Sequence, residues 1–304
     1  MKKRIRHYLG MIAFSHTIFA MPFALVGFSL GVREGFFMSA SSPGADILQG
    51  SYTNALVWRL ILVIGCMVFA RSAAMAFNRY LDRAYDANNP RTAGREIPAG
   101  VISPTGALLF TIGNALLFVA CTFFINSLCF YLSPVALGVI LGYSYTKRFT
   151  SLCHLVLGLG LSLAPLGAYL AVTGHFAVLP IVISLLVLCW VSGFDIIYSL
   201  QDEAFDRSQQ LFSMPVWLGK SKALLLSRIL HTGCAMLVLG AGWYGKFGTF
   251  YWVGAALFIA MLWYQQSLVK PDDLRKVNIA FMTSNGIASI GFAVFLWIDL
   301  LKFF

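Results

Sequence analysis

The sequence predicts an all-α polytopic membrane protein, a bundle of nine transmembrane helices that forms one domain over residues 1–304. Hydrophobic residues make up 59% of the chain and charged residues 11%, whereas a soluble domain is roughly 25% charged. The apolar residues also gather into runs of about 20, the length that an α-helix needs to cross a bilayer. This composition excludes an ordinary soluble enzyme, a disordered chain and a disulfide-stabilised scaffold.

The predicted spans follow one another along the whole chain. They lie near residues 8–32, 54–77, 105–125, 128–146, 152–173, 177–200, 223–244, 249–268 and 279–299. The basic start of the chain resembles a signal peptide, but its apolar run is longer than the 7–15 residues of a cleaved segment. We therefore expect a retained first span, with cleavage near Ser39–Ala45 as the alternative.

The charged residues predict the orientation of the bundle. The net charge is +10, and 18 of the 22 Lys and Arg residues fall at the N-terminus or in the loops on the same side. The positive-inside rule places that side in the cytoplasm and the protein in the inner membrane. Nine of the twelve acidic residues lie there too, which the rule does not require. The cations predict contact with anionic membrane lipids and no role in nucleic-acid binding.

Two groups of oxygen-bearing side chains follow the second and sixth spans. The first group consists of Asn78, Asp82 and Asp86. The second consists of Asp195, Tyr198, Asp202 and Asp206. Helical spacing keeps the members of each group within about 80° of one another around the helix axis. Such oxygens suit Mg²⁺, which takes one or two carboxylates and completes its shell with water and substrate phosphates. The two groups therefore predict a magnesium site shared with a phosphate-bearing ligand.

Cations that would complete a phosphate site follow the first group and the fourth span. They are Arg91, Arg95, Lys147 and Arg148, the last two close to Tyr145. Arginine binds phosphate through paired hydrogen bonds. One alternative is that the acids form solvated ion pairs with Arg79 and Arg83 of their own helix. For Lys147 and Arg148 the alternative is a purely topogenic charge.

Arg71 lies seven residues before Asn78, on nearly the same helix face and about 10 Å deeper in the membrane. An unpaired arginine at that depth is costly. We therefore expect Arg71 either to pair with Asp195 or to bind an anionic group on a second substrate.

At these positions the sequence resembles the UbiA superfamily of intramembrane prenyltransferases. The matching residues are Asn78, Asp82 and Asp86; Arg91, Thr92, Arg95, Pro98 and Gly100; Tyr145, Lys147 and Arg148; and Asp195, Tyr198, Asp202 and Asp206, followed by Ser213 and Gly219. The similarity covers most of the chain. Glu96 departs from the proline that many members carry, and the segment 14–23 looks closer to the menaquinone branch than to the ubiquinone enzymes.

The resemblance implies transfer of a polyprenyl group from polyprenyl diphosphate to a small aromatic carboxylic acid, in ubiquinone or menaquinone biosynthesis. The acceptor would be 4-hydroxybenzoate or a 1,4-dihydroxy-6-naphthoate type of acid. Mg²⁺ would be held by Asn78, Asp82, Asp86, Asp202 and Asp206, with Asp82 and Asp202 in catalytic roles. Asp195 is the expected base or orienting group for the acceptor phenol. Substrates would contact Asn78, Arg71, Arg91, Arg95, Tyr145, Lys147, Arg148 and Tyr198.

Two other functions fit parts of the sequence. A cation-coupled transporter also places acids inside a helical bundle, although it favours ionisable groups near the bilayer midplane and paired broken helices. A UbiA-type enzyme with a tetrapyrrole or phospholipid-type acceptor would share the same motifs.

Overall fold

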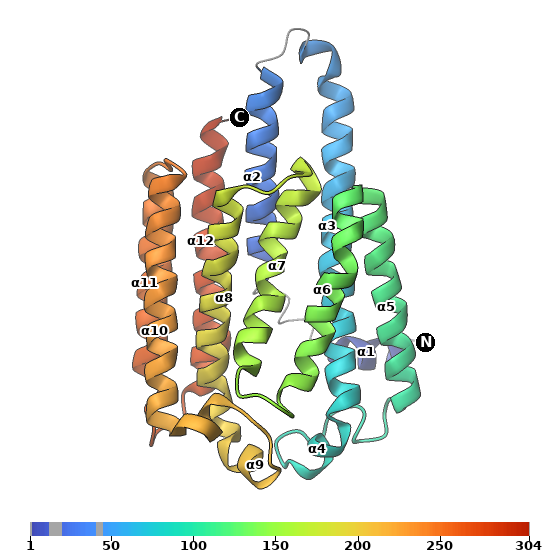
Figure 1. Cartoon of the computed structure of the whole chain (residues 1–304), viewed down its shortest axis with the longest axis vertical. Coiled ribbons are helices and arrows are strands. Elements are labelled where there is room, and N and C mark those ends of the chain that lie inside the picture. The colour runs from blue at the N-terminus through green and yellow to red at the C-terminus, as the bar shows by residue number, and fades with distance from the viewer. Residues whose placement is uncertain (1, 12–19, 41–44, 304) are drawn as a thin grey trace.

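The computed structural model describes residues 2–11, 20–40 and 45–303, and these ranges form an all-helical bundle without strands (Figure 1). Nine long helices run side by side within them. They are α2 (Met21–Ala40), α3 (Ala45–Leu81), α5 (Pro104–Ile125), α6 (Ser127–Thr146), α7 (Cys153–Thr173), α8 (Val178–Ser199), α10 (Met214–Tyr244), α11 (Thr249–Leu268) and α12 (Asn285–Leu300). The predicted all-α class is confirmed, and five of the nine predicted spans match a long helix within about four residues at both ends, namely 105–125, 128–146, 152–173, 177–200 and 249–268.

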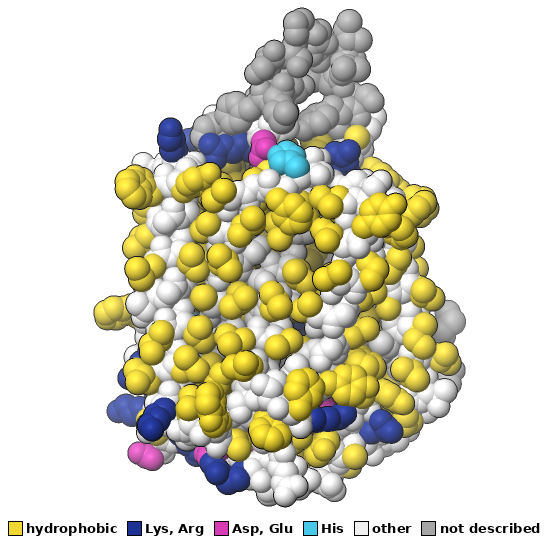
Figure 2. All heavy atoms as spheres, in the orientation of Figure 1, with side chains coloured by type: hydrophobic (Ala, Val, Ile, Leu, Met, Phe, Trp, Pro, Cys, Tyr) yellow, Lys and Arg dark blue, Asp and Glu magenta, His cyan; other side chains and the backbone are white. Residues whose placement is uncertain are grey.

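The outer surface of the bundle suits a lipid environment. Among the described residues, seven helical segments are long and apolar enough to cross a membrane, and α2 and α11 pack beside them in the bundle. Large apolar side chains such as Leu116, Met236 and Trp263 are exposed on this surface. Figure 2 shows hydrophobic side chains over the middle of one face, with Lys and Arg gathered toward its two ends. Such an extensive exposed apolar face indicates contact with lipid.

The first predicted span, 8–32, differs from the structure. Residues 2–11 form a separate helix, α1 (Lys2–Met11), and α2 begins only at Met21. Tyr8 of α1 stacks on Phe110 of α5 with ring centroids 4.9 Å apart, so α1 packs against the bundle at the end that carries α4. Residues 12–19 lie outside the described residues, and with them most of the segment 14–23 that pointed to the menaquinone branch.

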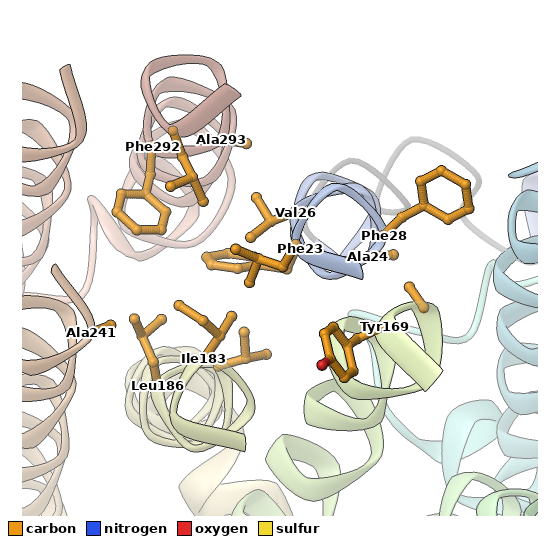
Figure 3. Packing of buried hydrophobic residues seen from close by; sticks show 14 of the residues in the cluster. Phe23, Ala24, Val26, Phe28, Tyr169, Ile183, Leu186, Ala241, Phe292 and Ala293 are labelled. Atoms are coloured by element: carbon orange, nitrogen blue, oxygen red, sulfur yellow. The ribbon is translucent and has the colours of Figure 1, made fainter. Parts of the chain in front are cut away.

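The interior of the bundle is filled by aromatic and aliphatic side chains from several helices. Phe23 of α2 contacts Trp190 of α8, Phe258 of α11 and Phe292 of α12, with ring centroids 5.2, 6.2 and 6.0 Å apart. Figure 3 shows Phe23 pointing between α8 and α12 toward Ile183 and Phe292. These contacts join α2 to the C-terminal half of the bundle.

Helices α7 and α8 pack closely because a glycine faces α8. A Cβ atom added to Gly158 would lie 2.7 Å from the carbonyl oxygen of Leu188, which is too close for any side chain. Small residues at such crossings let membrane helices approach each other. This close approach sets how the N-terminal part of α7 meets the C-terminal part of α8.

The short helices that follow α3 and α8 lie at the same end of the bundle (Figure 1). There α3 is followed by the short helix α4 (Arg83–Asn88), and α8 by a 3₁₀ turn (Leu200–Asp202) and the short helix α9 (Glu203–Ser208). Both acid-bearing segments therefore lie just outside membrane-spanning helices.

Candidate active site

The spacing of the acids predicted that both groups continue straight helices, and the structure shows that they do not. The helix breaks at Asp82, which precedes α4, and again at Asp202, which ends the 3₁₀ turn. Asp86 and Asp206 are buried, while Asp82 and Asp202 keep part of their side chains exposed. Each group thus presents one buried and one accessible carboxylate.

Two ion pairs hold neighbouring segments of the chain against the second group. Arg91, in the loop after the first group, donates through Nε and Nη2 to the two carboxylate oxygens of Asp202, at 3.0 and 2.6 Å. Its Nη1 donates to the hydroxyl of Tyr198 at 3.2 Å. Lys147 at the end of α6 donates from Nζ to Oδ1 of Asp206 at 2.9 Å. The loop after α4 and the end of α6 are thereby held against the second group.

The carboxylates of the first group are paired in the same way. Arg95 Nη1 lies 2.6 Å from Oδ1 of Asp86, and Arg148 Nη2 lies 3.1 Å from Oδ1 of Asp82. Asn78 Nδ2 donates to the other oxygen of Asp82 at 3.1 Å. Every predicted phosphate-binding cation therefore contacts a predicted metal ligand.

The alternative of ion pairs within one helix is wrong. Arg83 donates to the carbonyl oxygen of Tyr80 at 2.6 Å and lies over the Tyr80 ring. Arg79 forms no ion pair within the described residues, and its Nε atom is buried without a hydrogen-bond partner. The acids are instead held by cations from other segments, which a solvated helix surface would not require.

Burial and pairing shift the pKa values of these groups. Burial raises the pKa of the Asp82 carboxyl, and the nearby Arg148 guanidinium opposes this rise. Burial also disfavours the charged form of Lys147, but the Asp206 carboxylate outweighs it and holds the pKa of the ammonium above its ordinary value. At neutral pH Lys147 is therefore a cation, ready to contact an anionic ligand.

Aromatic rings surround the paired charges. Tyr145 lies with its ring 5.5 Å from the Arg148 guanidinium carbon. Tyr198 lies beneath Arg91 and packs on Phe281 with ring centroids 4.2 Å apart. Phe281 belongs to a π-helical segment, Ile279–Ser284, before α12. Such segments often occur at functional sites, but no periodicity in the sequence distinguished Phe281 from the other apolar residues of this span.

Arg71 does not pair with Asp195. Both residues are described, yet they form no salt bridge, and the Nε atom of Arg71 is buried without a hydrogen-bond partner. The ion-pair alternative for Arg71 is therefore wrong, and the arginine stays available for an anionic ligand. It lies in α3, on the membrane side of Asn78.

Asp195 is engaged instead by His154, a residue that the sequence did not single out. His154 Nδ1 lies 2.7 Å from Oδ2 of Asp195. The two residues are 41 positions apart, so no local spacing links them. The available signal was a histidine at the start of the fifth predicted span, on the side where the acids gather.

The donor set fits a magnesium ion that is bound together with a phosphate. The Oδ2 atoms of Asp86 and Asp206 are buried without hydrogen-bond partners, so each has a free coordination position. In the described part of the chain no three His, Cys, Asp or Glu side chains converge on one point. A metal held here would need oxygens from a ligand, as Mg²⁺ commonly does with substrate phosphates.

Comparison with known proteins identifies the family. The chain matches the UbiA prenyltransferase family over residues 20–290 and belongs to it. It is 31% identical over 235 residues to a 4-hydroxybenzoate octaprenyltransferase of Tolumonas auensis, covering 77% of this chain and 82% of the relative. A protein of the same name from Aeromonas salmonicida is 28% identical, covering 78% and 81%.

Solved structures agree on the fold. A UbiA homologue from Aeropyrum pernix superposes with a TM-score of 0.74 at 27% identity, covering 94% of this chain and 97% of the other. A homologue from Archaeoglobus fulgidus, solved with DMAPP and Mg²⁺ bound, gives a TM-score of 0.72 at 21% identity, covering 97% and 99%.

Proposed function

We propose that this protein transfers a polyprenyl group from polyprenyl diphosphate to a small aromatic carboxylic acid, in a Mg²⁺-dependent reaction of ubiquinone or menaquinone biosynthesis. The observation that carries the proposal is the set of four ion pairs, each joining a carboxylate to a cation suited to phosphate. Relatives named 4-hydroxybenzoate octaprenyltransferase favour this substrate pair.

The paired charges provide the diphosphate site. Four carboxylates face four cations, namely Arg91–Asp202, Arg95–Asp86, Lys147–Asp206 and Arg148–Asp82. The cations exchange these carboxylates for phosphate oxygens, and the carboxylates together with Asn78 become available to the metal. These carboxylates and Asn78 would hold Mg²⁺, whose charge would offset that of the diphosphate as it leaves. Because the pairs are neutral, metal and diphosphate bind best together: either one alone leaves an uncompensated charge in a partly buried site.

The acceptor binds next to Arg71 and Asp195, on the membrane side of the diphosphate. Arg71 pairs with its carboxylate, since no acidic side chain of the described residues forms an ion pair with the guanidinium. Asp195 accepts the proton of the phenol, which makes the ring carbon beside it more nucleophilic. The bond between prenyl C1 and the diphosphate oxygen breaks with its electron pair going to the oxygen, and the ring carbon bonds to C1 to give a dienone. Loss of the ring proton to water then restores the aromatic ring as a phenolate, and the protonated Asp195 returns its proton to that oxygen. Diphosphate is the leaving group.

The rest of the bundle serves the apolar part of the substrate. The prenyl chain lies among apolar side chains, where each buried CH₂ contributes about 0.8 kcal/mol. Apolar surroundings also exclude water from the reacting allylic carbon. The site faces the cytoplasm, on the side that carries most Lys and Arg residues, and the N-terminus lies on the same side.

The test is product formation by the purified protein with Mg²⁺, an all-trans polyprenyl diphosphate and a panel of acceptors. The panel contains 4-hydroxybenzoate, 1,4-dihydroxy-6-naphthoate and the matching phenols without a carboxylate. We expect C-prenylated acids and little product from the decarboxylated phenols. Equal use of the phenols would refute the role of a carboxylate, and no product from any acceptor would refute the proposed function.

Arg71→Ala should raise the acceptor KM far more than the prenyl diphosphate KM, because only the acceptor contact is lost. Arg59→Ala is the matched control: Arg59 lies in the same helix and donates to the carbonyl of Val172 at 2.9 Å, at the opposite end of the bundle. A rise confined to the prenyl diphosphate KM would assign Arg71 to the diphosphate instead.

A further inference from the structure

We propose that His154 is a positioning residue, which holds the Asp195 carboxylate in the orientation that receives the acceptor phenol. The inference deepens the proposed function, because it rests on Asp195 as the partner of that phenol. Its own observations are the contacts of His154, its burial, and the close packing of α7 on α8.

The hydrogen bonds of His154 define its tautomer. The backbone N–H of Met214 donates to Nε2 of His154 at 3.3 Å, so Nε2 is an acceptor. The hydroxyl of Ser199 lies 3.5 Å from the same atom but donates its hydrogen to the carbonyl of Ile196. The ring proton is therefore on Nδ1, which donates to Oδ2 of Asp195 at 2.7 Å. The imidazole thus holds one carboxylate oxygen through Nδ1–H.

The difference in burial indicates that Asp195 contacts the substrate directly and that His154 acts only through Asp195. The His154 side chain is 2% exposed and the Asp195 side chain 21% exposed. His154 is therefore too deeply enclosed to touch a ligand, whereas Asp195 keeps an accessible edge. Since Oδ2 is occupied by the imidazole, Oδ1 is the oxygen left for a substrate proton. Orientation of a base by a second group is a general device of acid–base catalysis.

The packing of α7 on α8 holds the pair in place. Gly158 lies one helical turn after His154, on the same face of α7, and the Leu188 carbonyl of α8 lies against it. On α8, Ser192 and Asp195 are three residues apart and share the face that meets α7. The His154–Asp195 distance is therefore determined by a crossing that has no room for a larger residue.

The chemical consequence is a defined direction of proton transfer. The phenolic O–H bond breaks as its proton passes to Oδ1 of Asp195, while Nδ1–H stays on His154 and stabilises the other oxygen. Without the imidazole, the Asp195 carboxylate can rotate, and neither Oδ1 nor Oδ2 is held at the position that receives the phenol proton. Misplacement of the base lowers the transfer rate most for acceptors whose phenols are weakly acidic, because their deprotonation depends most on the base.

The experiment compares His154→Leu and His154→Asn, with steady-state kinetics on the unmodified acceptor and on a ring-fluorinated acceptor of higher acidity. The Asn amide can keep a donor near the position of Nδ1, whereas Leu removes it. We expect His154→Leu to lower kcat/KM for the unmodified acceptor about 10- to 100-fold, with an unchanged prenyl diphosphate KM. The loss of kcat/KM in His154→Leu should be smaller with the fluorinated acceptor. His154→Asn should keep most of the wild-type kcat/KM.

The matched control is His231→Leu. His231 is also buried, but it contacts the carbonyl of Trp190 and the side chain of Gln266 and does not contact Asp195. It should change stability without favouring one acceptor over the other. A double-mutant cycle with Asp195→Asn should show strong non-additivity for His154, because the two residues act as one unit.

Two results would overturn the inference. One is a deficit of His154→Leu that is equal for both acceptors and is not recovered by Asn. The other is full additivity with Asp195→Asn. If His154→Leu fails to fold, His154→Asn takes its place both in the comparison of the two acceptors and in the double-mutant cycle with Asp195→Asn. The proposed function fails separately, when the wild-type protein forms no prenylated product from either acceptor.

Discussion

Gly158 offers a test of the site from outside its polar residues. We expect Gly158→Ala to separate His154 from Asp195 without removing any polar group. The new methyl carbon would lie 2.3 Å from Oγ of Ser192, a side-chain atom that can rotate away, and 2.7 Å from the backbone carbonyl oxygen of Leu188, whereas ordinary contact begins near 3.4 Å. Since Leu188 contributes backbone here, the helices must move apart by about 0.7 Å at this point.

The magnitude follows from this displacement. A shift of about 0.7 Å along the His154–Asp195 line would lengthen their 2.7 Å hydrogen bond to about 3.4 Å, beyond the usual limit of about 3.2 Å. Overpacking of this kind costs about 1–3 kcal/mol of stability. Misplacement of a catalytic group by about 1 Å can reduce rates about 100-fold. We therefore expect at least a 10-fold lower kcat/KM for the acceptor.

The assay measures prenyl transfer and thermal unfolding of purified variants in the same detergent or lipid. Gly160→Ala is the control, since its nearest neighbour across the interface is a side-chain carbon of Ile140 at 4.0 Å, an ordinary contact distance. It should keep wild-type activity and unfold at the same or a slightly higher temperature. Wild-type turnover in Gly158→Ala, or an equal loss of turnover in both variants, would show that the crossing at Gly158 does not set the His154–Asp195 distance.

Three further predictions concern other parts of the molecule. Asp82→Asn and Asp202→Asn should each abolish Mg²⁺-dependent transfer while the proteins still fold, as measured by turnover and melting curves; near-normal turnover in both would exclude the two-group site. Mg²⁺ alone should bind weakly by calorimetry, and at least 10-fold more tightly with a prenyl diphosphate analogue present; equal affinities would contradict the neutral-pair argument. At the opposite end of the bundle, Glu34 and the Thr173 carbonyl raise the pKa of His175. The contact between His175 and Glu34 should therefore stabilise the fold fully below about pH 6.5, and this stabilisation should be lost as the pH rises through the raised pKa. Glu34→Gln should flatten that dependence in melting curves recorded from pH 5 to 9.

The sequence predicted the helices well because the bilayer imposes a simple rule. A run of about 20 apolar residues has few alternatives to a spanning helix. Spans such as 105–125 and 249–268 accordingly match α5 and α11 within a residue. The first span did not, because a basic amphipathic start and an apolar run read as one segment in the sequence and form two helices in the structure.

The residues of the candidate site could be proposed from the sequence, but the pairing of their charges could not. Acids at the ends of apolar runs are rare, which singled out Asp82, Asp86, Asp202 and Asp206 in the sequence although the helices break at these positions. The sequence did not show that Arg91 crosses to the other group, since such contacts depend on how loops fold over the bundle end. His154 was missed for the same reason: its partner Asp195 is adjacent only after α7 and α8 have packed.

We infer that the two acid groups form one metal and diphosphate site. The most direct measurement is a structure of this protein with Mn²⁺ and a non-hydrolysable polyprenyl diphosphate analogue, with the metal located by anomalous scattering. We expect metal density next to both Asp82 and Asp202, with Arg91 and Lys147 moved from their carboxylates to phosphate oxygens. Metal at only one group, or intact Arg91–Asp202 and Lys147–Asp206 pairs beside a bound analogue, would contradict it.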